Sequence, residues 1–157
     1  IITATPTISF WSPSISAAFI KQWLTIDFPT KNIQFNKPIF QAEVGNTFVF
    51  GKGLMFSADY TFTGRGFDRV YQITEPMHRL DISLRKTFLK DALSVELRGD
   101  DLFQAKDVVK MVTDIYTIDQ SSIRDSRRFS FTLRYKFNSA NSKYKGTGAG
   151  NLQKSRL

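Results

Sequence analysis

The segment RFSFTLRYKF, residues 128–137, alternates polar and apolar side chains at every position. Its apolar side chains are those of Phe129, Phe131, Leu133, Tyr135 and Phe137. Successive side chains of a β-strand point to opposite faces, so this period of two predicts a strand with one apolar and one polar face. A helix would mix the two sets of side chains.

The same alternation recurs upstream of this segment, although less cleanly in places. It predicts four further strands, at residues 41–50, 54–63, 80–88 and 93–98. Lys86 lies on the apolar side of its segment, near a strand end where its long stem can carry the charge to water. Residues 15–28 are predicted to form a strand of ambiguous facing, and residues 5–11 the end of another, which makes about seven strands.

The connections between these strands alternate between short and long. Gly51-Lys52-Gly53 and Lys90-Asp91-Ala92 are predicted tight turns, and residues 11–14 fit a third, because these residue types adopt turn geometry at little cost. Long polar connections are predicted at about residues 29–38, 64–76 and 104–126. Transmembrane β-barrels show this asymmetry, with short periplasmic turns and longer extracellular loops.

The two faces of the strands predict opposite surroundings. The charges of the polar face suit a wet lumen that could contact a plug, and they are Asp81, Arg85, Glu96, Arg98 and Arg134. The residues expected to face lipid are Phe56, Ile82, Leu84, Leu97, Phe129, Phe131, Leu133, Tyr135 and Phe137. A soluble sheet packed on one face would also produce alternation, so a carbohydrate-binding β-sandwich is one alternative.

The expected fold is therefore all-β, an antiparallel up-and-down transmembrane β-barrel. Seven strands do not close a single-chain bacterial barrel, whose strand number is even. Residues 1–137 are accordingly expected to be the C-terminal strands and loops of a larger barrel. Residues 138–157 are rich in Ser, Gly, Asn and Lys and are expected to be a flexible basic periplasmic tail.

Composition excludes several kinds of site in this 157-residue chain. It contains no cysteine and one histidine, His78, so neither a thiolate centre nor a histidine cluster can form. Half of the net charge of +8 comes from four cations in the last twenty residues, which favours a solvated tail over a nucleic-acid surface. Asp100, Asp101 and Asp125 lack the spacing of an EF-hand. No catalytic residue, cofactor or metal is expected.

Two stretches resemble a known family. Gly99-Asp100-Asp101-Leu102-Phe103-Gln104 resembles the Asn-Leu-Phe-Asp-type motif near the end of TonB-dependent outer-membrane receptors, whose last strand is similar to residues 128–137. The tail from Ser142 to Gly150, with Arg156-Leu157 at its end, looks like one branch of outer-membrane β-barrel proteins. In that branch a carboxypeptidase-regulatory-like domain and a plug precede the barrel.

The resemblance implies a barrel of 22 strands in the bacterial outer membrane that imports a nutrient into the periplasm. This segment would contribute barrel wall, lumen surface and extracellular loops. Its partners would be outer-membrane lipid, the plug and remainder of the barrel, the substrate, and the TonB complex through a part N-terminal to Ile1; no nucleic-acid partner is expected. A small outer-membrane barrel without TonB coupling is the second alternative, and the residues select no particular substrate.

Overall fold

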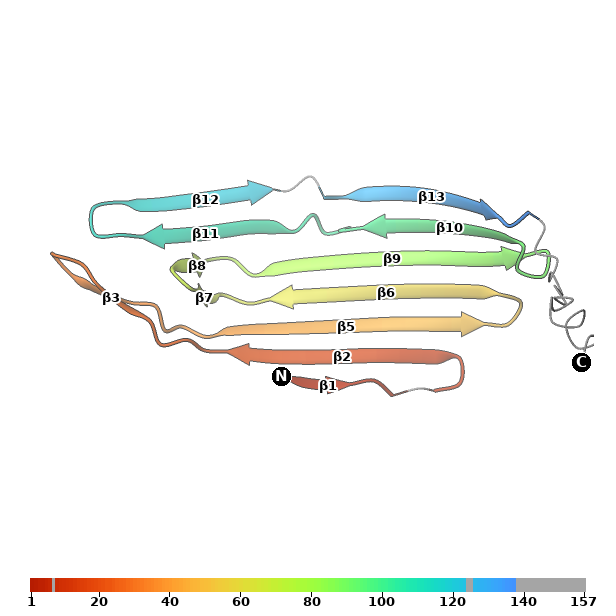
Figure 1. Ribbon diagram of the computed structural model, residues 1–157, viewed down its shortest axis with the longest axis horizontal. Helices are drawn as coiled ribbons and strands as arrows, with labels where there is room; N and C mark the ends of the chain where they lie inside the picture. Colours follow the sequence, from red (N-terminus) through yellow and green to blue (C-terminus); the bar gives the residue numbers. More distant parts are fainter. Residues whose placement is uncertain (7, 124–125, 138–157) are drawn as a thin grey trace, which may run out of the picture.

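Seven antiparallel strands form one continuous sheet in the order β1-β2-β5-β6-β9-β10-β13 (Figure 1). The structure is a computed structural model that describes residues 1–6, 8–123 and 126–137. The strands are β1 (Ile2–Ala4), β2 (Trp11–Ile20), β5 (Ile39–Phe50), β6 (Leu54–Thr63), β9 (Met77–Phe88), β10 (Leu93–Asp100) and β13 (Arg128–Tyr135). The five strands predicted from alternation are confirmed, with ends shifted by at most three residues.

Tight turns join the strands at one end of the sheet, here called the short-turn end. Lys52 and Gly53 both have positive φ, and a side chain at Gly53 would meet the Thr87 hydroxyl at 2.0 Å, so glycine is required there. The turn after β9 places Leu89, Lys90 and Asp91 in the left-handed region. The turns predicted at residues 51–53 and 90–92 are confirmed.

The predicted turn at residues 11–14 is wrong, because these residues begin β2. The chain turns earlier, between Ile8 and Trp11, where each backbone N–H donates to the other carbonyl and Ser9 has a φ of 33°. The Val49 N–H donates to the Phe10 carbonyl, so residues 10 and 49 form a hydrogen-bonded pair. Hydrogen-bonded and non-hydrogen-bonded pairs alternate along an antiparallel ladder. Pro13 is therefore in a non-hydrogen-bonded pair with Asn46, where an N–H would point away from β5. Pro13 also lies past the end of β1, and its missing donor therefore costs no ladder bond.

Further hairpins occupy the segments predicted to be long loops. β3 (Thr25–Asp27) pairs with β4 (Asn32–Gln34), β7 (Gly66–Asp68) with β8 (Tyr71–Ile73), and β11 (Lys106–Val112) with β12 (Thr117–Ile123). Most of these strands are too short to display a period of two, and β11 does not alternate cleanly. All three hairpins lie at the end opposite the tight turns, called the hairpin end (Figure 1). The predicted sorting of connections by length is confirmed.

The beginning of the chain also differs from the prediction. The first strand is β1, whereas residues 5–11 were expected to contain a strand end, and β2 stops at Ile20 although a strand over residues 15–28 was expected. The remainder of that range passes into β3, in the first hairpin.

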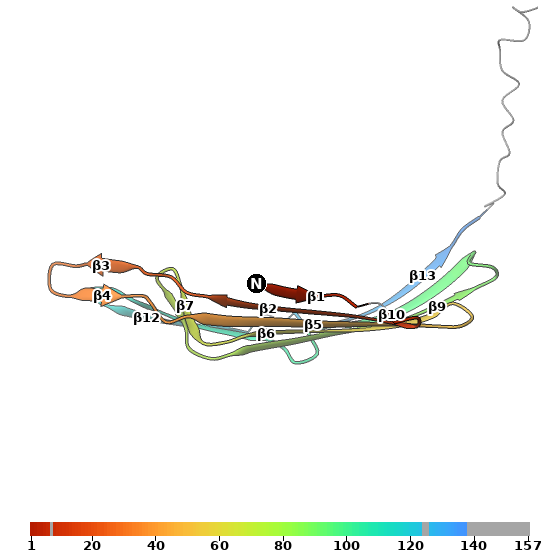
Figure 2. The same cartoon turned by 90° about the horizontal axis from the view of Figure 1, so that it is seen from below.

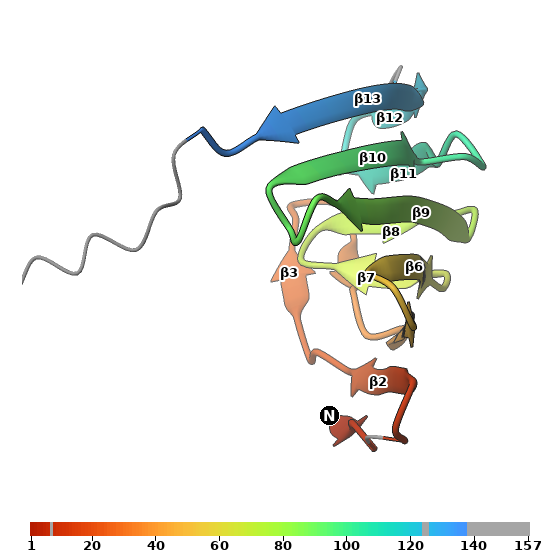
Figure 3. The same ribbon diagram turned by 90° about the vertical axis from the view of Figure 1, so that its right-hand side faces the viewer.

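The seven-stranded sheet is a single curved layer (Figures 2 and 3). The buried apolar side chains among the described residues are Pro13, Phe35, Ile39 and Ile73, and the Phe35 ring packs edge-on against the Phe67 ring at a centroid separation of 5.3 Å. Phe131 and Leu133 are 64% and 61% exposed, so no described element covers them as a sandwich would require. The β-sandwich alternative is wrong.

Both edges of this sheet are open. β1 pairs only with β2, and β13 pairs only with β10, so the described strands form an open wall and not a closed barrel. Within the described residues no helix has the length and apolarity needed to cross a membrane. The tail expected at residues 138–157 lies outside the described residues.

Candidate functional site

Register sorts the side chains of the wall onto two chemically different faces. Leu97 on β10 lies opposite Leu84 on β9 and Phe131 on β13, whereas the adjacent Glu96 lies opposite Arg85 and Thr132. The same sorting continues to β2, where Ile15 lies opposite Val44 and Ser16 opposite Glu43. Polar residues are few on the apolar face, and one of them, Asn46, accepts a hydrogen bond from Trp11 Nε1 at 3.1 Å.

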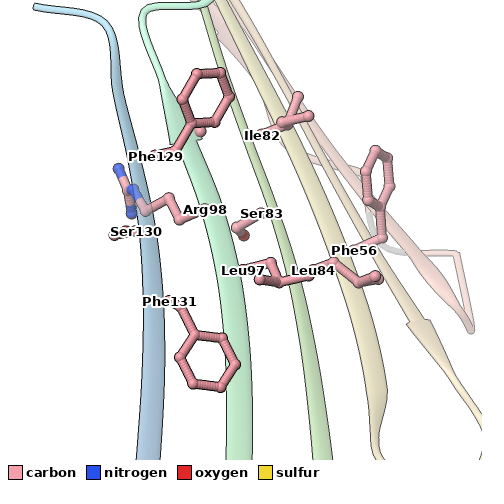
Figure 4. A pocket seen from close by; sticks show the side chains of 10 residues that line it. Phe56, Ile82, Ser83, Leu84, Leu97, Arg98, Phe129, Ser130 and Phe131 are labelled. Atoms are coloured by element: carbon pink, nitrogen blue, oxygen red, sulfur yellow. The ribbon is translucent and has the colours of Figure 1, made fainter.

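The apolar face carries all of the residues within strands that were predicted to meet lipid. These are Phe56, Ile82, Leu84, Leu97, Phe129, Phe131, Leu133 and Tyr135, and Phe137 follows with its ring 4.5 Å from that of Tyr135. Figure 4 shows six of these side chains on one side of β6, β9, β10 and β13. They line a shallow groove of about 560 Å³.

Gly99 lies in this groove and helps to form it. A Cβ at this position would lie 2.9 Å from Leu102 Cδ2 and 3.4 Å from Phe129 Cε1. Glycine therefore allows Leu102 and Phe129 to close over the backbone, which explains the first position of the Gly99–Gln104 motif.

Aromatic rings form two bands across the apolar face, one at each end. At the short-turn end Phe48 stacks with Trp11, Phe50 and Phe56 at ring separations of 6.0–6.2 Å. The hairpin-end band consists of Phe40, Tyr60, Phe62, His78 and Phe103.

The outermost rings of the two bands are about as far apart as the apolar band of a transmembrane barrel is tall. Phe40 and Phe50 are ten residues apart on β5, or about 33 Å at the usual rise of a strand. With the tilt of about 40° found in transmembrane barrels this becomes about 25 Å, the height of their apolar outer band. Because aromatic rings favour the membrane interfaces, the apolar face has the dimensions of a lipid-facing wall.

The five charges predicted for a lumen all lie on the polar face, and the described ion pairs join two of them to residues outside that set. Arg98 Nε donates to Asp100 Oδ1 at 2.6 Å, and Arg79 pairs with Asp81 at 3.1 Å. Arg85 and Glu96 are opposite each other without a described ion pair, and Arg134 lies opposite Ser94. The ion pairs thus concentrate at the hairpin end of the face.

Asp100 and Asp101, which lack the spacing of an EF-hand, organise the corner where β10 leads into β11. Asp100 is buried and accepts hydrogen bonds from Arg98 and, at 2.7 Å, from Arg128 across the ladder. Asp101 is 1% exposed, and its carboxylate accepts from the Ala105 N–H and the Ser126 hydroxyl. This corner therefore ties β13 to β10.

The carboxylate of Asp101 is held in its charged form. Burial by itself raises the pKa of Asp101, but the hydrogen bonds from Ser126 and Ala105 and the charges of Arg79 and Arg127 lower it, and the net pKa is below the usual value. The positive φ of Asp101 (48°) is one that Asp tolerates better than most residues. Asp101 of the Gly99–Gln104 motif therefore has a structural role: its carboxylate holds Ala105 and Ser126 at the corner.

A mixed polar and apolar cavity of about 360 Å³ lies on the hairpins. The larger cavity is lined by Asp68, Tyr71 and Gln120, among others. It shares Asp107 and Met77 with a neighbouring cavity of about 250 Å³, which is also lined by Arg79 and Asp101. The polar face of the wall therefore continues onto the hairpins. Carboxylates, an amide and an exposed aromatic ring supply hydrogen bonding and stacking for a ligand entering along this face.

His78 belongs to the aromatic band of the apolar face. Its Nδ1 is 2.7 Å from the Tyr60 hydroxyl and its ring is 5.1 Å from that of Phe62. The described residues contain no group of three or more His, Cys, Asp or Glu side chains that could hold a metal.

Comparison with protein families gives one match over most of the chain. A family model described as outer membrane protein beta-barrel family matches residues 1–135. Comparison with curated proteins and with solved structures finds no match.

Proposed function

This chain belongs to the outer membrane protein beta-barrel family and is located in the bacterial outer membrane, and we propose that it is part of the wall of a receptor that imports a nutrient. In this proposal the apolar face meets lipid and the polar face meets the lumen. The short turns lie on the periplasmic side and the hairpins on the extracellular side.

The separation of an exposed apolar face from a charged face carries this proposal. An apolar face as exposed as that of Phe129 (74%), Phe131 and Leu133 would aggregate in water, but lipid solvates it without cost. The distance between the outermost rings of the two aromatic bands, about 25 Å at the strand tilt usual in barrels, supports the same orientation.

The two open edges support the idea that further strands complete the wall. Unpaired N–H and C=O groups are costly within a bilayer, so β1 and β13 require neighbouring strands. We propose that these belong to the remainder of a 22-stranded barrel, the number that the resemblance implies.

Coupling to TonB and a plug inside the lumen are proposed on the resemblance of the Gly99–Gln104 motif. Asp81, Arg85, Glu96, Arg98 and Arg134 would face that plug. The segment itself would perform no bond-making chemistry and would bind neither a cofactor nor nucleic acid. The hairpin cavity near Tyr71 would take part in substrate capture.

Deletion of the full-length gene, followed by growth on single nutrients, tests the import proposal. We expect one uptake defect, and we expect TonB depletion to reproduce it in the wild type. If the gene deletion causes an uptake defect but TonB depletion of the wild type does not reproduce it, the small passive barrel is favoured. Normal uptake of every nutrient tested would contradict import.

A further inference from the structure

A small basic hollow lies on the polar face at the short-turn end. Its volume is about 180 Å³, and it is lined by Arg85, Thr87, Asp91, Ala92, Ser94, Arg134 and Lys136. Arg134 on β13, Ser94 on β10 and Thr87 on β9 lie opposite one another in one row of the sheet. Three neighbouring strands, together with Lys136 directly after β13, thus place two hydroxyls and three cations around one hollow.

The cations of this hollow are not neutralised by described partners. Within residues 1–6, 8–123 and 126–137, no ion pair involves Arg85, Arg134 or Lys136. Asp91 is the single acid in the lining, and Glu96 opposite Arg85 is the nearest acid in register on the same face. Cations exceed acids even when both carboxylates are counted.

The hairpin end of the same face is arranged differently. There Arg79 is paired with Asp81, and Asp100 bridges Arg98 and Arg128. A polar face that only kept the interior hydrated would not need to leave one cluster of cations unpaired while pairing the others. The contrast indicates that the unpaired cations receive an anionic partner from outside the described strands.

We propose that the hollow binds an oxyanion, a phosphate or carboxylate group. Guanidinium groups present several N–H donors in a planar fork that fits two oxygens at once, and Lys136 adds a compact positive charge. The Ser94 hydroxyl can donate a further hydrogen bond, and the Thr87 hydroxyl already lies 3.5 Å from the Gly53 carbonyl. A concave surface with an excess of positive charge also raises the local concentration of anions.

The oxyanion has two sources that share this chemistry. It is either a soluble anion in the lumen or a carboxylate on a segment of the protein enclosed by the barrel. The inference rests on the proposed lumen orientation of the polar face, but its test is independent of nutrient uptake.

Calorimetric titration of the full-length protein in detergent with inorganic phosphate tests the soluble source. We expect Arg85→Gln and Arg134→Gln each to weaken phosphate binding at least tenfold. Lys90→Gln removes an exposed cation from the adjacent turn without altering the lining, and it should change the affinity less than twofold. Equal losses in all three variants would overturn the site, because net charge alone would then explain the binding.

Carbodiimide coupling tests the second source if phosphate does not bind the wild type. Carbodiimide links an amine to a carboxylate when the two groups form an ion pair. Mass spectrometry then identifies the residue that carries the linked carboxylate. Coupling of Lys136 to an enclosed segment, lost in Arg134→Gln, would support a carboxylate occupant. Coupling to the strand next to β13 would reduce the hollow to an ordinary wall ion pair and overturn the proposal, as would no coupling.

Discussion

Placing an arginine at Leu97 is the most direct test of which face of the wall meets lipid. Leu97 lies between Leu84 and Phe131 on the apolar face, four residues along β10 from its start at Leu93. Four residues of a strand tilted by about 40° rise about 10 Å. This is close to the middle of a 25 Å apolar band.

An arginine near the middle of that band costs about 2–4 kcal/mol of unfolding free energy, compared with about 0–1 kcal/mol near the interfaces. Each 1.4 kcal/mol is a factor of ten, so the unfolding equilibrium of Leu97→Arg should shift by about 30-fold to 700-fold. In contact with water, the same change at a half-exposed position would stay within about 0.5 kcal/mol.

Thr132→Arg is the matched control. Thr132 lies on the neighbouring strand β13, opposite Glu96 on the polar face, so an arginine there gains an acidic neighbour and stays in the lumen. We expect its cost to remain within about 0.5 kcal/mol.

Urea unfolding of the full-length protein in lipid vesicles measures both variants, and heat-modifiable migration on gels confirms that each has folded. Equal costs at the two positions, or a larger cost at Thr132, would refute the assignment of the faces. A cost below 1 kcal/mol for Leu97→Arg with normal folding would place this position at an interface or in water.

Three further perturbations follow from the corner and the hairpins. Gly99→Val should destabilise by about 1–3 kcal/mol in urea unfolding, because its new side chain meets neighbours at 2.9 Å and 3.4 Å, whereas Gly51→Val, with no atom within 4 Å, should not add a clash. The pKa of Asp101 is lowered in the folded state, so its stabilising contribution is present above its unfolded pKa and lost as the pH falls through the folded pKa. Asp101→Asn should therefore be less stable at pH 7, and its stability should fall less than that of the wild type between pH 5 and pH 2; parallel pH profiles would disprove this. Phe35→Ala removes a fully buried ring from the base of the β3–β4 hairpin and should increase trypsin cleavage at Lys31, and unchanged cleavage would show that the ring does not anchor this hairpin.

The amino-acid sequence determined the strands of the wall, their two faces and the sorting of their connections by length. These features are local: alternation over eight to twelve residues selects a strand and its facing, and residues such as Gly and Asp mark a turn. It failed where the local signal is weak. Three-residue strands such as β7 are too short to show a period, and Pro13 looked like a turn residue although it lies where the ladder needs no donor.

Only the tertiary structure decided which polar residues meet. Alternation assigns a face, but sliding a strand by two residues preserves every facing while changing every partner. Asp100 therefore could have met many residues, and register chose Arg128 across the ladder and placed Asp101 beside Ser126. The same register brought Arg85 and Arg134, far apart in the chain, to one hollow, because three strands must align before these charges can share a site.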